Sequence, residues 1–224
     1  MSYHETYEFV ALDQPLNARE MRTLRAISSR AIITPTRFYN WYDCGTLKGD
    51  PHDMLRNYFD AFAWAGEDGD RWGMVRLPLK CVDVPHWQKY ITRQRGRQFP
   101  RSVSFSTHQH HVVLTLIPYS DEPSDDVFDE GNWIAWLVGL RAALIAGDTR
   151  ALYLGWLLTV QRGEVPISAR VPPRPPGLTR LTGTLHAFAE YLGLNPALLK
   201  VAMSANMTQL RTAGRLLSAA EGAG

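Results

Sequence analysis

The clearest chemistry in the sequence is that of guanidinium groups gathered in one segment. Five cations precede an apolar stretch that carries histidines, and the aromatic residues beside them are Trp87, Tyr90 and Phe99. Arginine binds phosphate and carboxylate groups through paired hydrogen bonds, and aromatic rings can stack on bases. We predict that a nucleic acid or an acidic partner binds here. The predicted binding residues are Lys89, Arg93, Arg95, Arg97, Arg101, Trp87 and Tyr90.

An acidic segment downstream offers a second interpretation of the same cations. If the strands between the two segments form a hairpin, the segments lie side by side and pair within the chain. Exposed ion pairs of this kind contribute only about 0 to 1 kcal/mol each, so the cations would then form a solvated connector. The acids are Asp121, Glu122, Asp125, Asp126, Asp129 and Glu130. Both interpretations stay open.

Two histidines suggest metal chemistry as the alternative. His108 and His110 point to the same side if residues 107–113 are extended, because side chains alternate along a strand. A catalytic zinc site needs a third protein ligand, and no HExxH or CxxC spacing supplies one. We therefore predict no metal and no other cofactor. The alternative function is a metal-dependent hydrolase or nuclease that uses His108 and His110.

Other reactive or aromatic side chains give weaker indications. The thiol of Cys44 has no fixed base beside it, and with Cys81 as the only other cysteine there is no disulfide framework. An aromatic stripe on two later helices could line a pocket, although such rings are more often core. Its members are Trp133, Trp136, Leu140, Tyr153 and Trp156. The sequence names no small-molecule ligand.

The elements that must position these residues alternate at first between strand and helix. Asn17 followed by Glu20 predicts a capped helix through residue 27, and Asp50 followed by Pro51 predicts a second helix through residue 64. Strands are expected at 7–12, at 31–42 with a break near Pro35, at 72–79, at 103–105 and at 112–117, with a short helix at 84–92. The pattern predicts an α+β fold with a mixed β-sheet and a split βαβ-like N-terminal half.

Helices alone are expected in the rest of the chain. Segments 132–146 and 148–161 are apolar almost all round, so we expect them to pack on the sheet or to form an interface. Further helices are predicted at 181–192, 196–203 and 207–220. The predicted organisation is an α+β domain (1–130), the apolar helix pair (131–164), a Pro-rich linker (165–177) and a helical C-terminal region (178–224).

Composition limits the classes of protein that fit. With 45% apolar and 21% charged side chains the chain is not intrinsically disordered, and a net charge of +2 is too mild for general affinity to nucleic acid. Arg141 and the polar residues at 147–150 interrupt the longest apolar stretch, so no membrane span is expected. We expect a cytoplasmic location, since the first residues lack the pattern of a secretory signal.

Several segments resemble a known family. They are YEFVALDQPL (7–16), LRAISSRA (24–31), ITPT (33–36), KGDP (48–51), YFDA (58–61) and ALYLGWL (151–157). This combination resembles a family of uncharacterised bacterial proteins over most of residues 5–200. The resemblance implies a bacterial, cytoplasmic protein and carries no activity, cofactor or catalytic residue onto this chain.

Taken together, these patterns predict a non-catalytic adaptor or binding subunit of a larger bacterial assembly. A protein partner is expected, and nucleic acid is a second candidate. The prediction depends on the concentration of charge in one segment and on two helices with more apolar surface than exposed helices carry.

Overall fold

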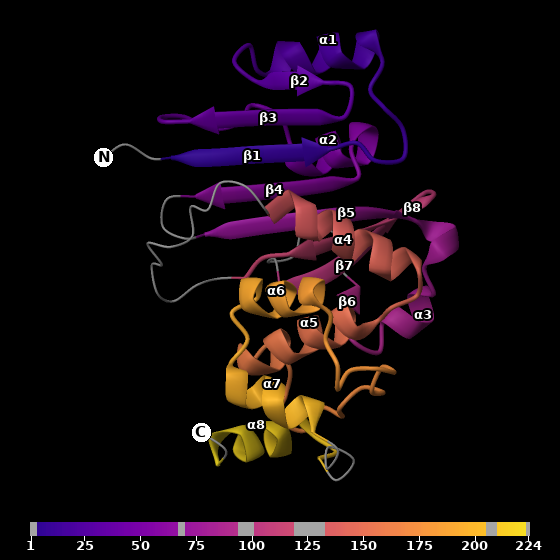
Figure 1. The fold of residues 1–224 in the computed structure, drawn as a ribbon, viewed down its shortest axis with the longest axis vertical. Coiled ribbons are helices and arrows are strands. Elements are labelled where there is room, and N and C mark those ends of the chain that lie inside the picture. Colours follow the sequence, from indigo (N-terminus) through magenta and orange to yellow (C-terminus); the bar gives the residue numbers. More distant parts are fainter. Residues whose placement is uncertain (1–3, 67–69, 94–100, 119–132, 205–209, 223–224) are drawn as a thin grey trace.

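An eight-stranded sheet forms the N-terminal half of the protein, and helices follow it (Figure 1). The structure, a computed structural model, describes residues 4–66, 70–93, 101–118, 133–204 and 210–222. The strands are β1 (Glu5–Val10), β2 (Ile32–Thr34), β3 (Arg37–Tyr42), β4 (Ala61–Gly66), β5 (Arg71–Pro78), β6 (Thr92–Arg93), β7 (Val103–His108) and β8 (His111–Leu116). Their order is β2-β3-β1-β4-β5-β8-β7-β6. Among the described strands, β6 alone pairs in parallel, with β7, which makes the sheet mixed as predicted.

The first four strands form two interleaved split βαβ units. Helix α1 (Ala18–Ile27) connects β1 to β2, and β3 lies between these two strands. Helix α2 (Pro51–Tyr58) connects β3 to β4, and β1 lies between them. This is the ferredoxin-like β-α-β-β-α-β arrangement. The predicted α+β class and split βαβ half are confirmed, but this arrangement serves many activities and identifies none.

Local capping chemistry explains where the first two helices begin. The side chain of Asn17 accepts from the backbone N–H of Glu20, whose carboxylate accepts from the N–H of Asn17 at 2.8 Å. At the start of α2, the side chain of Asp50 accepts from the backbone N–H groups of His52 and Asp53, with Pro51 at the first helical position. Both starts are as predicted, because each depends on residues within one turn.

The end of α2 differs from the prediction. The helix ends at Tyr58 instead of continuing through residue 64, and residues 61–66 form strand β4. Ala61 and Ala63 pack on one face of the sheet and Phe62 on the other. A strand buried on both faces has no polar alternation, so its periodicity does not distinguish it from a buried helix.

Helices make up the described part of the second half, and the first two of them pack on one face of the sheet. The helices are α4 (Trp133–Ile145), α5 (Arg150–Gln161), α6 (Gly183–Tyr191), α7 (Pro196–Met203) and α8 (Ala213–Glu221). Helix α4 lies on β4 and β5, and α5 packs against β7 (Figure 1). Their side chains share one core with Ala61, Val75 and Leu114 of the sheet, and this core continues to α8.

The opposite face of the sheet packs against α1 and α2. Phe9, Phe38 and Phe62 lie there with Leu24 of α1 and Leu55 of α2, all of them fully buried. Because successive residues of a strand point to opposite faces, the neighbours of these phenylalanines face the side of α4. Among the described residues, no helix has the length and apolar character that crossing a membrane requires.

Candidate functional site

On the sheet face that α4 packs against, no described helix covers β3 and β2, and α4 reaches only as far as the neighbouring strand β1. Figure 1 shows α4 in front of β4 and β5, and none of the described helices in front of β3. The strand register places Trp41 opposite Thr6, Tyr39 opposite Glu8, and Ile32 opposite Tyr39. We call this surface the open face. It consists of Thr6, Glu8, Val10, Ile32, Arg37, Tyr39 and Trp41.

The indole of Trp41 is the largest exposed group of the open face. It is 48% exposed, whereas Phe38 on the other face of the same strand is fully buried. The ring of His4 stacks on it almost in parallel, with centroids 5.7 Å apart and an interplanar angle of 5°. His4 Nδ1 lies 2.9 Å from Oδ1 of Asp43. The imidazole therefore supports the indole in place while leaving about half of Trp41 accessible.

Ile32 extends the apolar surface onto the edge strand. Its side chain is 57% exposed and lies directly opposite Tyr39. The described residues contain four exposed large apolar side chains, and Ile32 and Trp41 are the two that share this face. Because β2 has only three residues, it offers little unpaired backbone, so the side chains dominate what a partner would meet.

The charges on the open face neutralise one another. Arg37 donates from Nε to Oε1 of Glu8 at 2.6 Å, and its guanidinium carbon lies 4.7 Å from the ring centre of Tyr39. The cation thus has both a carboxylate and an aromatic ring beside it. The open face consequently presents apolar and aromatic surface with little net charge.

The predicted arginine segment lies at the far edge of the sheet and is only partly described. Lys89 and Arg101 are exposed, and Arg101 Nη1 donates to the backbone oxygen of Glu164 at 3.1 Å. Arg93 pairs through its backbone in β6. Its side chain, all of Arg95 and Arg97, and the acids at 121–130 lie outside the described residues. Strands β7 and β8 do form the hairpin that the pairing interpretation requires, but both interpretations remain predictions.

Trp87 and Tyr90 are core residues, which corrects the expectation that they stack on bases. They are 3% and 4% exposed. Trp87 packs edge-on against Phe105 at 5.8 Å, and Tyr90 packs against Tyr153 at 6.4 Å. Burial also raises the pKa of Tyr90. The short helix α3 (Val84–Trp87) turns these rings inward, so neither has a free face for a ligand.

The histidine pair does not have the geometry that a metal site would need. Strand β7 ends at His108, β8 begins at His111, and Gln109 has a φ of 39° in the turn between them. His110 lies in that turn, so the expected extended run over 107–113 is a hairpin and the two imidazoles do not share a strand face. Ser106 Oγ lies 3.0 Å from His108 Nε2, and burial with nearby Arg56 lowers the pKa of His108.

The remaining candidates from the sequence are a metal site, the two cysteines and the aromatic stripe, and within the described residues none of them has the surroundings of a reactive site. In the part of the chain that the structure describes, no three His, Cys, Asp or Glu residues are grouped closely enough to hold a metal ion. Cys44 and Cys81 are free thiols. In the aromatic stripe, Leu140, Tyr153 and Trp156 belong to the core, as expected for rings on apolar helices.

The chain matches no known protein family, no curated protein and no solved structure. The open face had a signal in the sequence, since RFYNWY at 37–42 alternates Phe38 and Asn40 with Arg37, Tyr39 and Trp41. That alternation shows two faces but does not show which of them a later helix covers.

Proposed function

We propose that this chain is a non-catalytic adaptor that docks onto a protein partner through the open face. The observation that carries the proposal is the exposure of Trp41 and Ile32 on neighbouring strands, beyond the part of this sheet face that α4 and α5 cover. Contiguous apolar patches on a folded protein often mark interaction sites, and tryptophan is enriched among the residues that contribute most to binding.

The charge of the open face favours a protein over a nucleic acid. Surfaces that bind single strands combine stacking rings with a cationic groove along the backbone. Here the guanidinium of Arg37 is held by Glu8 at 2.6 Å, and His4 lies 2.9 Å from Asp43. A phosphate would have to displace these carboxylates. A partner with an apolar, weakly charged surface would meet no such cost.

The arginine segment remains a second proposed contact, for an acidic partner or a nucleic acid. The exposed side chains of Lys89 and Arg101 support it. Strands β2 and β6 form opposite edges of the sheet, so this contact would lie on the order of 30 Å from the open face. A bacterial cytoplasm is the proposed location, supported by the free thiols of Cys44 and Cys81.

The test compares variants of the open face with a matched surface variant. Protein carrying Trp41→Ser and Ile32→Ser is immobilised beside the wild type and beside Ile167→Ser, which alters an exposed apolar residue elsewhere (73% exposed). Circular dichroism checks folding. We expect one host protein, identified by mass spectrometry, to be retained by the wild type and by Ile167→Ser but not by the open-face variant, and to bind again when purified.

Three results would overturn the proposal. The first is equal retention of all host proteins by the three immobilised forms. The second is a wild type that self-associates in sedimentation velocity and a Trp41→Ser variant that is monomeric, which would make the open face an interface between copies of this chain. The third is binding of polyuridylate that is lost in Trp41→Ser, which would make it a nucleic-acid platform.

A further inference from the structure

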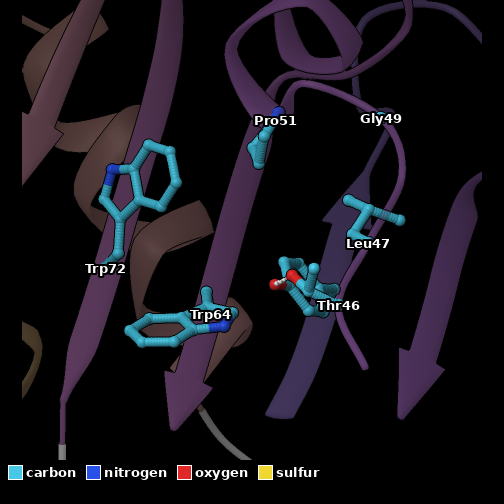
Figure 2. Close-up of a pocket in the computed structure, with 7 residues that line it drawn as sticks. Thr46, Leu47, Gly49, Pro51, Trp64 and Trp72 are labelled. Carbon is cyan, nitrogen blue, oxygen red and sulfur yellow. Dashed lines mark hydrogen bonds between the residues drawn. The ribbon is translucent and has the colours of Figure 1, made fainter. Parts of the chain in front are cut away.

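A cavity lies on the other face of the sheet, beneath the loop that leads into α2. Its volume is about 280 Å³. The lining comes from β1, β4 and β5 on one side and from the β3–α2 loop on the other (Figure 2). The lining residues are Tyr7, Thr46, Leu47, Gly49, Pro51, Trp64 and Trp72. None of them carries a charge, so an ionic ligand would find no counter-ion in this wall.

One indole N–H in the wall has no partner. Nε1 of Trp64 is buried and makes no hydrogen bond, and the same is true of Nε1 of Trp72. Figure 2 shows that the nitrogen edge of Trp64 turns toward Thr46 across the cavity, whereas that of Trp72 turns away from it. Buried donors nearly always find acceptors in folded proteins, so the N–H of Trp64 is a free donor that an occupant could satisfy.

The polar corner of the cavity is already organised. Tyr7 donates its hydroxyl hydrogen to Oε2 of Glu5 at 2.7 Å, and its oxygen lies 2.8 Å from Oγ1 of Thr46. Burial and the bond to Glu5 raise the pKa of Tyr7 to about 12, so the phenol stays neutral at physiological pH. Because the hydrogen of Tyr7 goes to Glu5, the hydroxyl of Thr46 donates to Tyr7, and its oxygen at the exposed mouth remains an acceptor for an occupant.

The second indole is held in a fixed orientation. The ring of His52 lies against Trp72 with centroids 5.1 Å apart, and Phe62 packs edge-on against Trp72 at 5.0 Å. Trp72 therefore gives the cavity a stable aromatic wall. Such a wall favours a flat ring over a branched aliphatic group, because aromatic rings gain from offset or edge contacts with each other.

We infer that this cavity binds a small, flat, uncharged heteroaromatic molecule whose ring acceptor receives the N–H of Trp64. The ring would pack beside Trp72, and Thr46 would contact a substituent at the mouth. A volume of about 280 Å³ is near the lower end for ligand pockets and suits one or two fused rings. The inference is independent of the open face, because Tyr7 and Trp64 point to the opposite side of the sheet.

Quinoline and naphthalene are suitable probes, because they share shape and size while only quinoline has a ring acceptor. Binding is measured by titration of the full chain labelled with ¹⁵N in its tryptophan side chains. We expect quinoline to shift the indole N–H signal of Trp64 and to bind about tenfold more tightly than naphthalene. Trp64→Phe should remove this preference, since it deletes the donor and keeps an aromatic ring.

Trp72→Phe is the matched control, because its N–H turns away from the cavity (Figure 2). It should keep the preference for quinoline. The inference is overturned if quinoline leaves the Trp64 signal unchanged, if the two probes bind equally to the wild type, or if Trp64→Phe retains the preference. Spectra of each variant without probe show whether it is folded. If a variant is not folded, the test is whether quinoline shifts the Trp64 signal of the wild type.

Discussion

Nη2 of Arg141 in α4 lies 3.5 Å from Oδ1 of Asp60, directly before β4. Both groups are almost completely buried, at 5% and 1% exposed. Arg141 also reaches Oδ2 of Asp13 at 2.6 Å, and Asp60 is held by Arg76 at 2.9 Å. The backbone N–H groups of Leu12 and Asp13 donate to Oδ2 of Asp60 at 2.7 and 2.9 Å. This network joins the helical region to the sheet.

The first prediction concerns the stability that Asp60 provides. Asp60→Asn should lower the free energy of unfolding by about 3 kcal/mol, because it leaves the guanidinium of Arg76 without its counter-ion and Arg141 with Asp13 alone. Urea denaturation measures the change. Asp53→Asn is the control, since Asp53 pairs with Arg56 at the exposed surface and should cost about 1 kcal/mol or less. Equal losses in the two variants would contradict the assigned importance of the network.

The second prediction follows from the ionisation of Asp60. Burial alone would raise the pKa of its carboxyl, but hydrogen bonds from Asp13, Leu12 and Arg76 outweigh burial and hold the pKa below the ordinary 3.8. A carboxylate with a lowered pKa stabilises the folded state at neutral pH, and this stability is lost as the pH falls through its folded-state pKa.

Unfolding free energies of the wild type and of Asp60→Asn should therefore converge on acidification below about pH 4 and differ most near pH 7. Urea titrations at several pH values measure the difference. The pKa of Asp148 is also lowered, because its interactions with Arg150 outweigh the effect of burial. Subtracting the two curves removes the contribution of such carboxyls. A difference that stays constant from pH 7 to pH 3 would contradict the prediction.

The third prediction tests the arginine segment. Replacing Arg93, Arg95, Arg97 and Arg101 together by Ala should abolish salt-dependent binding of polyanions, because each neutralised phosphate releases counterions. Fluorescence anisotropy of a labelled oligonucleotide, measured at several salt concentrations, gives the slope. If the wild type does not bind, or if the variant binds as well as the wild type, the segment does not contact nucleic acid.

Local features of the fold were predictable from the sequence. The capping residues Asn17 and Asp50 mark helix starts because their partners lie within three positions along the chain. Strand β4 was not predictable, since Phe62 is buried beneath α2 and Ala63 beneath α4, which begins seventy positions later. The identity of a doubly buried strand depends on packing partners that its own pattern does not reveal.

The candidate sites were less predictable than the fold. The alternation in β3 separates Phe38 from Trp41, yet only the position of α4 leaves Trp41 exposed. Likewise, the spacing of His108 and His110 fits one strand face, but a turn at Gln109 separates them. The cavity beneath the β3–α2 loop brings Thr46 to Trp64 from segments that have no common motif. Tertiary packing decides each of these cases.

The last prediction tests whether Glu8 keeps the open face from binding nucleic acid. Glu8→Gln removes the carboxylate that pairs with Arg37 at 2.6 Å, so the guanidinium becomes available beside Tyr39 and Trp41. We expect this variant to bind single-stranded oligonucleotides more tightly than its parent. The slope of log affinity against log salt should steepen by about 0.7, the value for one phosphate contact on a single strand.

The measurement requires a background in which the arginine segment carries the four Ala substitutions, so that only the open face contributes. Trp41→Ala added to Glu8→Gln should reverse the gain, because stacking on the indole would supply much of the new affinity. Thr6→Ala, which alters the residue opposite Trp41, is the control and should leave the gain in place. Oligonucleotide binding that is unchanged by Glu8→Gln would show that the ion pair does not set the selectivity of this face.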